Sequence, residues 1–173
     1  MGNSAGGGAS QAAYASTLQN LTAELAENPS PVTTLPSTGT AAFNGVVTVA
    51  APQVNLTESA MGAMEMDVDF ATARFTGSAG NFIASDANLA TGRTTSTRTD
   101  GSFTFEGDVA PGASGLTGDV RGNIALPSSG NVDLTGDFSG AIHQGDNRYL
   151  SMGGLYMEDA QGNNYIGNFV MGE

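Results

Sequence analysis

The chain has 173 residues and no cysteine, and its 17 Asp and Glu residues against 5 Arg and no Lys give a formal net charge of −12. The absence of cysteine excludes disulfides, thiolate catalysis and thiolate metal ligands. The negative charge repels phosphate groups, so nucleic acids and anionic lipid surfaces are unfavourable partners. The length predicts one domain with a short appendage.

The N-terminal part of the chain predicts a tether followed by one helix. Residues 1–10 are rich in Gly, Ser and Ala and carry no charged side chain, which is typical of a flexible tether. Residues 11–28 predict an amphipathic helix that Ser10 can cap and that Pro29 ends. Its single apolar stripe consists of Tyr14, Leu18, Leu21 and Leu25. We expect this stripe to pack on the following domain or to close one end of it.

Residues 29–39 form a Pro-containing linker, and residues 40–173 show the alternation of apolar and polar residues that is typical of β-strands. The clearest strand patterns are 116–126 and 132–142, then 64–70 and 103–109, and weaker patterns cover 40–50, 73–83, 149–158 and 164–171. The longest connections are expected at 51–60 and 84–101. Asp100-Gly101 and Asn163-Asn164 are interpreted as hairpin turns.

A recurring unit of the strand region is a large apolar residue, one spacer and a glycine, as in Phe105-Glu106-Gly107 and Phe138-Ser139-Gly140. Residues two apart lie on the same face of a strand, so a bulky side chain and a bare backbone share one face. This suits a sheet that curves tightly and closes. We therefore predict an all-β fold, a small soluble eight-stranded antiparallel β-barrel preceded by one N-terminal amphipathic helix.

Alternation alone also fits an outer-membrane barrel, whose apolar face points outward. The glycines lie on the apolar face, where they suit a crowded interior. An inverted barrel would crowd carboxylates such as Asp119 and Asp137 into one lumen with few basic partners. Trp is absent and aromatic residues make up only 7%, which is too little for two aromatic girdles. These observations favour the soluble barrel.

Candidate catalytic groups are few. His143 is the only histidine, belongs to no nucleophile motif, and is interpreted as an exposed residue at a strand end; a hydrolase built around it is the least favoured function. Asp67 with Asp69 and Asp133 with Asp137 lack the spacing of a calcium loop and fall on a solvated face. We expect no catalytic residue, no cofactor and no metal site.

Recognition is expected in the loops, because long loops on rigid barrels usually carry it. The segment 85–101 contains Arg93 and Arg98, and the loop 144–149 contains Arg148 and Tyr149. An alternative is that these side chains only keep the loops solvated. The candidate partner-binding residues are Arg93, Arg98, His143, Arg148 and Tyr149.

The stretch Gly136-Asp137-Phe138-Ser139-Gly140, a short polar loop and Met152-Gly153-Gly154-Leu155 resembles the penultimate hairpin of transferrin-binding protein B barrels. That family writes Gly-x-Phe-x-Gly, a loop, then Gly-Gly before a strand. The C-terminal barrel of factor H binding protein looks similar, with Leu35-Pro36 entering the first strand and Tyr165-Ile166-Gly167 in the last one. The resemblance covers roughly residues 40–173.

The resemblance implies an eight-stranded barrel on a lipid-anchored surface protein of a Gram-negative bacterium. Met1 would stand where the family has an acylated cysteine, and the Gly/Ser tether would be the spacer after it. The matched residues are structural, the handle domain of transferrin-binding protein B is missing, and no transferrin-binding residue carries over. Iron acquisition is therefore not inferred.

The sequence leads to one expected function and one alternative. The expected function is that of a non-enzymatic, lipid-anchored bacterial envelope protein, monomeric, whose barrel loops bind a protein or another macromolecule. Its place would be the outer membrane, at the cell surface or on the periplasmic face. The alternative is a lipocalin-like carrier of a small apolar ligand, against which the bulk of Phe75, Phe105 and Phe138 argues.

Overall fold

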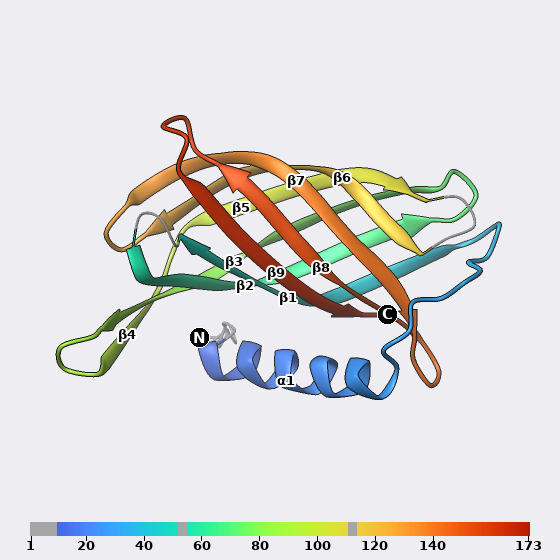
Figure 1. The fold of residues 1–173 in the computed structure, drawn as a ribbon, viewed down its shortest axis with the longest axis horizontal. Coiled ribbons are helices and arrows are strands. Elements are labelled where there is room, and N and C mark those ends of the chain that lie inside the picture. Colours follow the sequence, from blue (N-terminus) through green and yellow to red (C-terminus); the bar gives the residue numbers. More distant parts are fainter. Residues whose placement is uncertain (1–9, 52–54, 111–113) are drawn as a thin grey trace, which may run out of the picture.

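A computed structural model describes residues 10–51, 55–110 and 114–173. Nearly all of the expected tether over 1–10, and part of the connection expected over 51–60, lie outside the described residues. The described chain contains one helix and nine strands (Figure 1). None of the helices in the described ranges is long and apolar enough to span a bilayer.

Eight of the strands close into one antiparallel barrel. The strands are β1 (Thr40–Ala51), β2 (Asn55–Asp69), β3 (Arg74–Asn88), β4 (Arg93–Arg98), β5 (Gly101–Val109), β6 (Gly115–Leu126), β7 (Gly130–Gln144), β8 (Tyr149–Glu158) and β9 (Asn164–Gly172). The sheet order is β2-β1-β9-β8-β7-β6-β5-β3-β4, and a further pairing of β2 with β3 closes the ring. The predicted eight-stranded barrel is confirmed, and β4 lies outside the ring.

The barrel interior pairs large rings with glycines on neighbouring strands. Phe105 lies directly opposite Gly77, and Phe75 lies directly opposite Gly107. A Cβ atom on Gly77 would lie 2.2 Å from the Phe105 ring, so only a glycine leaves room for it. The predicted crowding of rings and bare backbone on the inner face is therefore confirmed, and it acts between strands as well as along each strand.

A stack of aromatic rings occupies the middle of the barrel. The rings of Phe105 and Phe138 are 4.9 Å apart and nearly parallel, at 8°. The ring of Phe138 lies 4.7 Å from that of Phe169 at 17°. Together with the surrounding buried Val, Leu, Ile and Met side chains, these rings form one continuous core. Burial of this apolar surface is the main favourable term for the fold.

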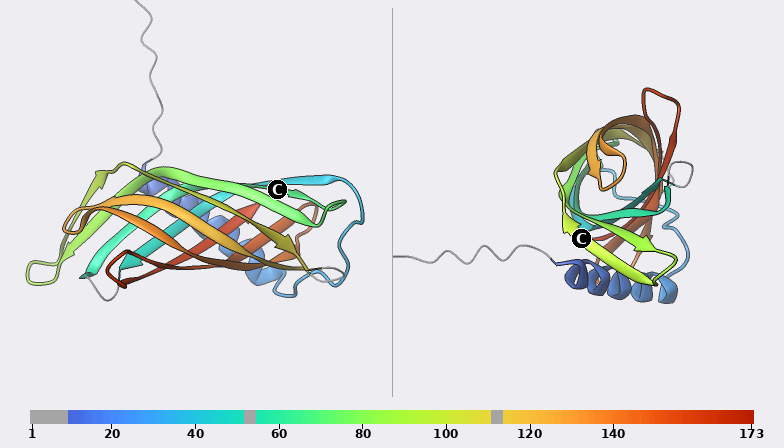
Figure 2. Two further views of the ribbon diagram at one scale, coloured as in Figure 1. Left: turned by 90° about the horizontal axis from the view of Figure 1, so that it is seen from above. Right: turned by 90° about the vertical axis from the view of Figure 1, so that its left-hand side faces the viewer.

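Helix α1 (Gln11–Glu27) lies along the outer wall of the barrel, as Figures 1 and 2 show. The Ser10 Oγ accepts a hydrogen bond of 3.2 Å from the Ala13 N–H, which confirms the predicted cap. Leu21 and Leu25 pack on the wall at β8 and β9, and Tyr14 packs on it at β1 and β3. Of the two expected arrangements, the stripe therefore packs on the wall and does not close an end.

The long connection expected at 84–101 is wrong. β3 continues to Asn88, a turn occupies 89–92, and β4 follows at Arg93–Arg98. The strand was missed because all six residues of β4 are exposed, so no apolar alternation marks it. The connection expected at 51–60 is also too long, since β1 reaches Ala51 and β2 begins at Asn55.

The two expected hairpin turns have different outcomes. Asp100-Gly101 is not a hairpin turn, because β4 and β5 are not paired and β3 lies between them. The Asp100 carbonyl instead accepts a hydrogen bond of 2.9 Å from the Ala125 N–H. Asn163 closes the β8–β9 turn, where its carbonyl accepts from the Asp159 N–H at 3.1 Å, and Asn164 begins β9.

Candidate functional site

The five candidate partner-binding residues lie at opposite ends of the barrel. Arg93 and Arg98 are the first and last residues of β4. His143 is the second-to-last residue of β7. Arg148 directly precedes β8 and Tyr149 is its first residue, and this end of the barrel lies near the C-terminal end of α1 (Figure 1). The five residues therefore fall into two regions, one around α1 and one around β4.

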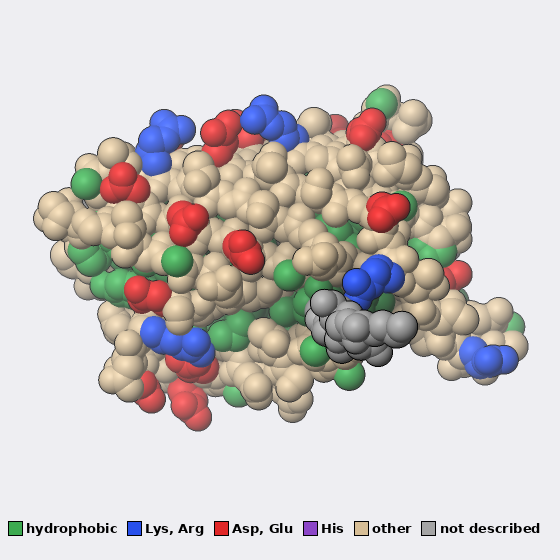
Figure 3. Space-filling model, turned by 180° about the vertical axis from the view of Figure 1, so that it is seen from behind, with side chains coloured by type: hydrophobic (Ala, Val, Ile, Leu, Met, Phe, Trp, Pro, Cys, Tyr) green, Lys and Arg blue, Asp and Glu red, His purple; other side chains and the backbone are tan. Residues whose placement is uncertain are grey.

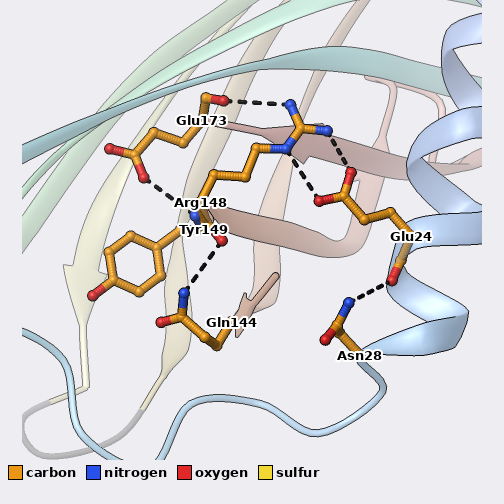
Figure 4. Close-up of polar contacts among 6 residues, drawn as sticks. All are labelled: Glu24, Asn28, Gln144, Arg148, Tyr149 and Glu173. Atoms are coloured by element: carbon orange, nitrogen blue, oxygen red, sulfur yellow. Dashed lines mark hydrogen bonds and ion pairs between the residues drawn. The ribbon is translucent and has the colours of Figure 1, made fainter. Parts of the chain in front are cut away.

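The first region is an ionic clamp formed by Glu24, Arg148 and Glu173 (Figure 4). The Arg148 Nε and Nη2 atoms donate to the two carboxylate oxygens of Glu24, at 3.2 and 2.5 Å. The Arg148 Nη1 donates to the Glu173 carbonyl at 3.4 Å, and the Glu173 carboxylate accepts from the Tyr149 N–H at 3.2 Å. The clamp thus ties the last turns of α1 to the loop before β8 and to the end of the chain.

Electrostatics favours the charged form of both partners in the clamp. The hydrogen bonds from Arg148 lower the pKa of Glu24, with a smaller opposing effect of burial. The same hydrogen bonds raise the pKa of Arg148. The Arg148 guanidinium and the Glu24 carboxylate therefore satisfy each other through two hydrogen bonds within the chain.

His143 is not an exposed strand-end residue, which corrects the expectation from the sequence. Its side chain is only 5% exposed, and it lines a cleft of about 260 Å³ between α1 and the wall. Alternation along β7 does place it outward, but α1 and the residues after it cover that part of the wall. Pro31 forms an isolated bridge with His143, and the Val32 N–H donates to the neighbouring Ile142 carbonyl at 3.0 Å.

Tyr149 lies at the rim of the same end. Its ring makes an edge-on contact with Phe70, with centroids 6.1 Å apart at 60°. The side chain is half-buried and packs against the main core. Tyr149 therefore takes part in closing this end of the barrel.

The second region is the projecting hairpin, defined as residues 83–98. β3 pairs with β5 through Gly80 and pairs with β4 from Ile83 onward, so it changes partner at the rim of the barrel. On its other edge β3 stays paired with β2 as far as Asp86, and beyond that point β3 and β4 extend as a ribbon away from the barrel (Figures 1 and 2). At its tip, Leu89 is 82% exposed.

The base of the projecting hairpin is fixed by backbone and side-chain hydrogen bonds. The Thr99 N–H donates to the Phe82 carbonyl at 2.9 Å, and the Thr99 Oγ1 donates to the Ala125 carbonyl at 2.5 Å. The N-terminal turns of α1 brace one face, since the Tyr14 hydroxyl donates to the Asn81 carbonyl at 2.8 Å. The hairpin is therefore held at a defined angle to the barrel.

A second bridge between α1 and the hairpin is formed by the Gln11 side chain. Its Nε2 donates to the Ser85 Oγ at 3.0 Å, and its Oε1 accepts from the Ser96 Oγ at 2.6 Å. Ser85 and Ser96 are opposite each other in the ladder, so one amide spans both strands. The opposite face carries a cleft of about 410 Å³ lined by Asp86, Asn88, Thr91, Arg93 and Thr95.

The arginines differ in how they are paired. Arg74 pairs with Asp108 and Arg121 pairs with Glu106 on the barrel wall, each at 3.6 Å, and Arg148 pairs with Glu24. Arg93 forms no ion pair within the described residues. Figure 3 shows acidic and basic side chains spread over the wall, whereas the protruding lobe has a basic side chain and no visible acidic one near its end. The hairpin carries two arginines, Arg93 and Arg98, and one carboxylate, Asp86, on a protein that is acidic elsewhere.

Glu58 is a buried charged residue that sequence reasoning did not identify. It faces the barrel interior, is 2% exposed, and accepts hydrogen bonds from the Ser128 N–H and from the Ser129 Oγ, the latter at 3.2 Å. The sequence indicates this orientation, because Glu58 is an even number of residues from the inward-facing Met64 and Met66 and therefore shares their face of the strand. Its contacts fasten the β6–β7 turn across the end of the barrel.

The clefts of about 310 and 350 Å³ are lined by wall and turn residues such as Thr104, Arg121 and Asn131. The stacked rings of Phe105, Phe138 and Phe169 belong to the buried core of the barrel. Within the described ranges, no three His, Asp or Glu side chains converge to hold a metal ion.

Searches with this chain against models of protein families, curated proteins and solved structures found no match.

Proposed function

We propose that this protein is a non-enzymatic binding module that presents the projecting hairpin to a protein partner. The observation that carries the proposal is the hairpin itself, a ribbon that leaves the barrel with every residue of β4 exposed. A rigid scaffold that displays an exposed segment is a common arrangement for recognition.

Three features of the hairpin support this role. Its base is fixed by Thr99 and Tyr14, so little ordering entropy is lost on binding. Its tip carries Leu89 as an exposed apolar residue, which would lose unfavourable contact with water in a complex. Its Arg93 is available for an ion pair, in contrast to the paired arginines of the wall and of the clamp.

The location proposed with this function is the bacterial envelope, through an N-terminal lipid anchor. The resemblance to surface-barrel families supports it. Expression of the full native gene, labelling with a fatty-acid analogue and protease treatment of intact cells would test it. Labelled and protease-accessible protein is the expected result, and unlabelled, protected protein would contradict the anchored location.

Site-specific photo-crosslinking in intact cells of the source organism would test the binding role. A photoreactive phenylalanine analogue at Leu89 is expected to give a discrete adduct, and the same analogue at the exposed wall residue Thr104 is expected to give none. The adduct should weaken when Arg93→Gln is added. An adduct at Thr104 alone, or equal adducts at both positions, would contradict the proposal.

A further inference from the structure

The outer wall of the barrel has one nearly uncharged side. The neighbouring strands β8, β9 and β1 contain a single charged residue, Glu158, although the chain has 17 Asp and Glu residues. Outside the projecting hairpin, the large apolar side chains that the described residues leave exposed lie on β8 and β9, and they are Met152, Tyr156 and Ile166. Depletion of charge together with exposed Tyr and Met side chains is typical of the centre of a protein–protein interface.

The apolar part of this side is the open wall, defined as Met152, Gly154 and Tyr156 on β8 with Ile166 and Asn168 on β9. Tyr156 lies directly opposite Ile166, and Gly154 lies directly opposite Asn168. Alternate residues of a strand share one face, so Met152 and Tyr156 lie on either side of the bare position at Gly154. The open wall therefore has a low row in its middle, with larger apolar side chains beside it.

Gly154 is not required by the packing of the barrel itself. At the preceding Gly153, an added Cβ would lie 2.1 Å from the Ser139 carbonyl oxygen, so the barrel leaves no room for a side chain there. At Gly154, the only described atom near an added Cβ would be the Gly167 carbonyl oxygen, at 3.5 Å, which is ordinary contact. A glycine inside a strand often marks a place where another backbone approaches closely.

Helix α1 covers the adjoining part of the same wall and indicates which element fits on the open part. Leu21 and Leu25 pack on Leu150 and Val170, and Gly154 lies four residues beyond Leu150 on β8. Four residues of a strand span about 13 Å. The strands cross α1 obliquely (Figure 1), so the separation perpendicular to the helix is shorter. Packed helices have axes about 8–10 Å apart, so a second helix over Gly154 would lie beside α1.

The side of α1 that borders the open wall suits such a neighbour. Thr22 and Ala26 line the cleft of about 260 Å³ between α1 and the wall, together with Met152. Ala15 lies on the same side of the helix, seven residues before Thr22. These residues of α1 are small, uncharged and exposed, so they allow close approach of another helix. The cleft has room for one large apolar side chain from it.

We propose that the open wall binds an amphipathic helix of a partner protein, which lies beside α1 with its apolar side on Gly154 and with cationic residues along its margins. One large side chain of the partner helix packs over Gly154 between Met152 and Tyr156, and another enters the cleft. The helix extends the layer that α1 begins. β1 and β2 separate the open wall from the projecting hairpin, so this contact goes beyond the proposed function and does not depend on it.

The carboxylates at the border of the open wall favour a cationic partner. Asp137 lies directly opposite Tyr156 on β7, and Glu158 lies two residues beyond Tyr156 on β8. Both are exposed, and neither forms an ion pair within the described residues. Lys or Arg residues beside the apolar stripe of the partner would complement them and the net charge of −12. The same net charge disfavours a second copy of this chain and an anionic lipid surface.

A fluorescence anisotropy titration of the full chain with a labelled helical peptide would test the inference. The probe is a peptide of about 18 residues made of Leu, Ala, Gln and Lys, with Leu along one stripe and Lys on both margins of that stripe. One control has the same composition in scrambled order, which removes the stripe. A second control replaces every Lys by Glu. The probe should bind about tenfold tighter than either control.

Protein variants locate the binding. Ile166→Thr keeps a branched side chain but removes apolar contact, so it should weaken binding of the probe about fivefold. Gly154→Gln fills the low row and should weaken binding about as much. Thr104→Gln, at an exposed position on β5, should leave it unchanged. Thermal unfolding followed by circular dichroism would verify that the variants remain folded.

A thiol on the open wall gives an independent readout of the orientation of the bound helix. Because the chain has no cysteine, Met152→Cys provides a unique thiol. It should form a disulfide faster with a probe that carries one Cys in the Leu stripe than with a probe that carries it on the opposite side. Equal rates would contradict binding through the apolar stripe.

Other outcomes would overturn the inference. Equal binding of the probe and its scrambled control would mean that charge alone attracts the peptide, and equal effects of Gly154→Gln and Thr104→Gln would place the binding elsewhere. Dimers in sedimentation velocity that Ile166→Thr abolishes would assign the open wall to a second copy. Flotation with phosphatidylcholine vesicles that the same change abolishes would assign it to a lipid surface. Photo-crosslinking at Leu89 is independent of these results, so their failure would leave the proposed role of the hairpin standing.

Discussion

The clamp around α1 and the projecting hairpin contain the same residue types in opposite environments. At the clamp, Arg148 is bound at two points by Glu24, and Leu25 is buried against β8 and β9. At the hairpin, Arg93 has no ion pair within the described residues, and Leu89 is 82% exposed. The contrast shows that the internal partners of an arginine or a leucine, and not its type, decide whether it stabilises the fold or is available for binding.

Matched leucine substitutions should give the largest contrast. Leu25→Ala removes buried apolar contacts with the wall and should lower the free energy of unfolding by about 2–3 kcal/mol. Leu89→Ala removes an exposed side chain and should change it by less than about 0.5 kcal/mol. Urea unfolding followed by circular dichroism would measure both. Equal losses would mean that the two leucines have similar environments, contrary to the structure.

Matched arginine substitutions should give a smaller contrast. Arg148→Gln removes the partly exposed ion pair with Glu24 and should cost at most about 1 kcal/mol of unfolding free energy, because solvent screens such pairs. It should also speed proteolysis in α1. Arg93→Gln should change the free energy of unfolding by less than about 0.5 kcal/mol and should leave the rate of proteolysis in α1 equal to that of the parent. If Arg93→Gln proved the more destabilising change, the assignment of the clamp as the stabilising region would be wrong.

The effect of Arg148→Gln should depend on pH in a defined direction. The pKa of Glu24 is lowered below its ordinary value of 4.5 by its hydrogen bonds to Arg148. The contribution of the pair is therefore fully present above pH 4.5 and is lost as the pH falls through the lowered pKa of the folded state. The stability difference between the parent and Arg148→Gln should shrink toward zero over that range. A difference that grows on acidification would contradict the sign.

The smallest global effect is expected from the turn of the projecting hairpin. Gly92 has a positive φ of 66° with open space around it, so Gly92→Ala strains the backbone without a steric clash. The strain, about 1 kcal/mol, should favour local opening of the hairpin. Amide hydrogen exchange should become faster in β4 and remain unchanged in β7. Unchanged exchange in β4 would show that the turn does not control the order of the hairpin.

The barrel was predictable because its signal is local. Alternation over 132–142 shows both faces of β7, and the glycines on the inner face indicate closure. The projecting hairpin was missed for the complementary reason, since β4 is solvated on both faces and has no apolar period. Arg93 and Arg98 stood out in the sequence because cations are rare in this acidic chain, and both lie on β4; their role in binding stays a prediction.

The environment of the clamp could not be read from the sequence. Arg148 and Glu24 are 124 positions apart, and no local pattern connects them. His143 was placed on the correct face of its strand but was expected to be exposed, because alternation does not show that α1 covers that face. Where distant parts of the chain pair with a residue or cover it, its ion pairs and its burial can be known only from the tertiary structure.

The Phe82 carbonyl and the Thr99 N–H, which bracket the projecting hairpin, lie 2.9 Å apart. Of the residues between them, 83–86 still pair with β2 as part of the ring. The cassette beyond them, residues 87–98, leaves the ring and returns to it, and β3 and β5 remain neighbours across the junction. Mutation, recombination or grafting could therefore exchange this cassette for another while the ring of eight strands kept its closure. A lineage that carries this barrel could acquire new partners by exchanging one ribbon, with its folding core inherited intact.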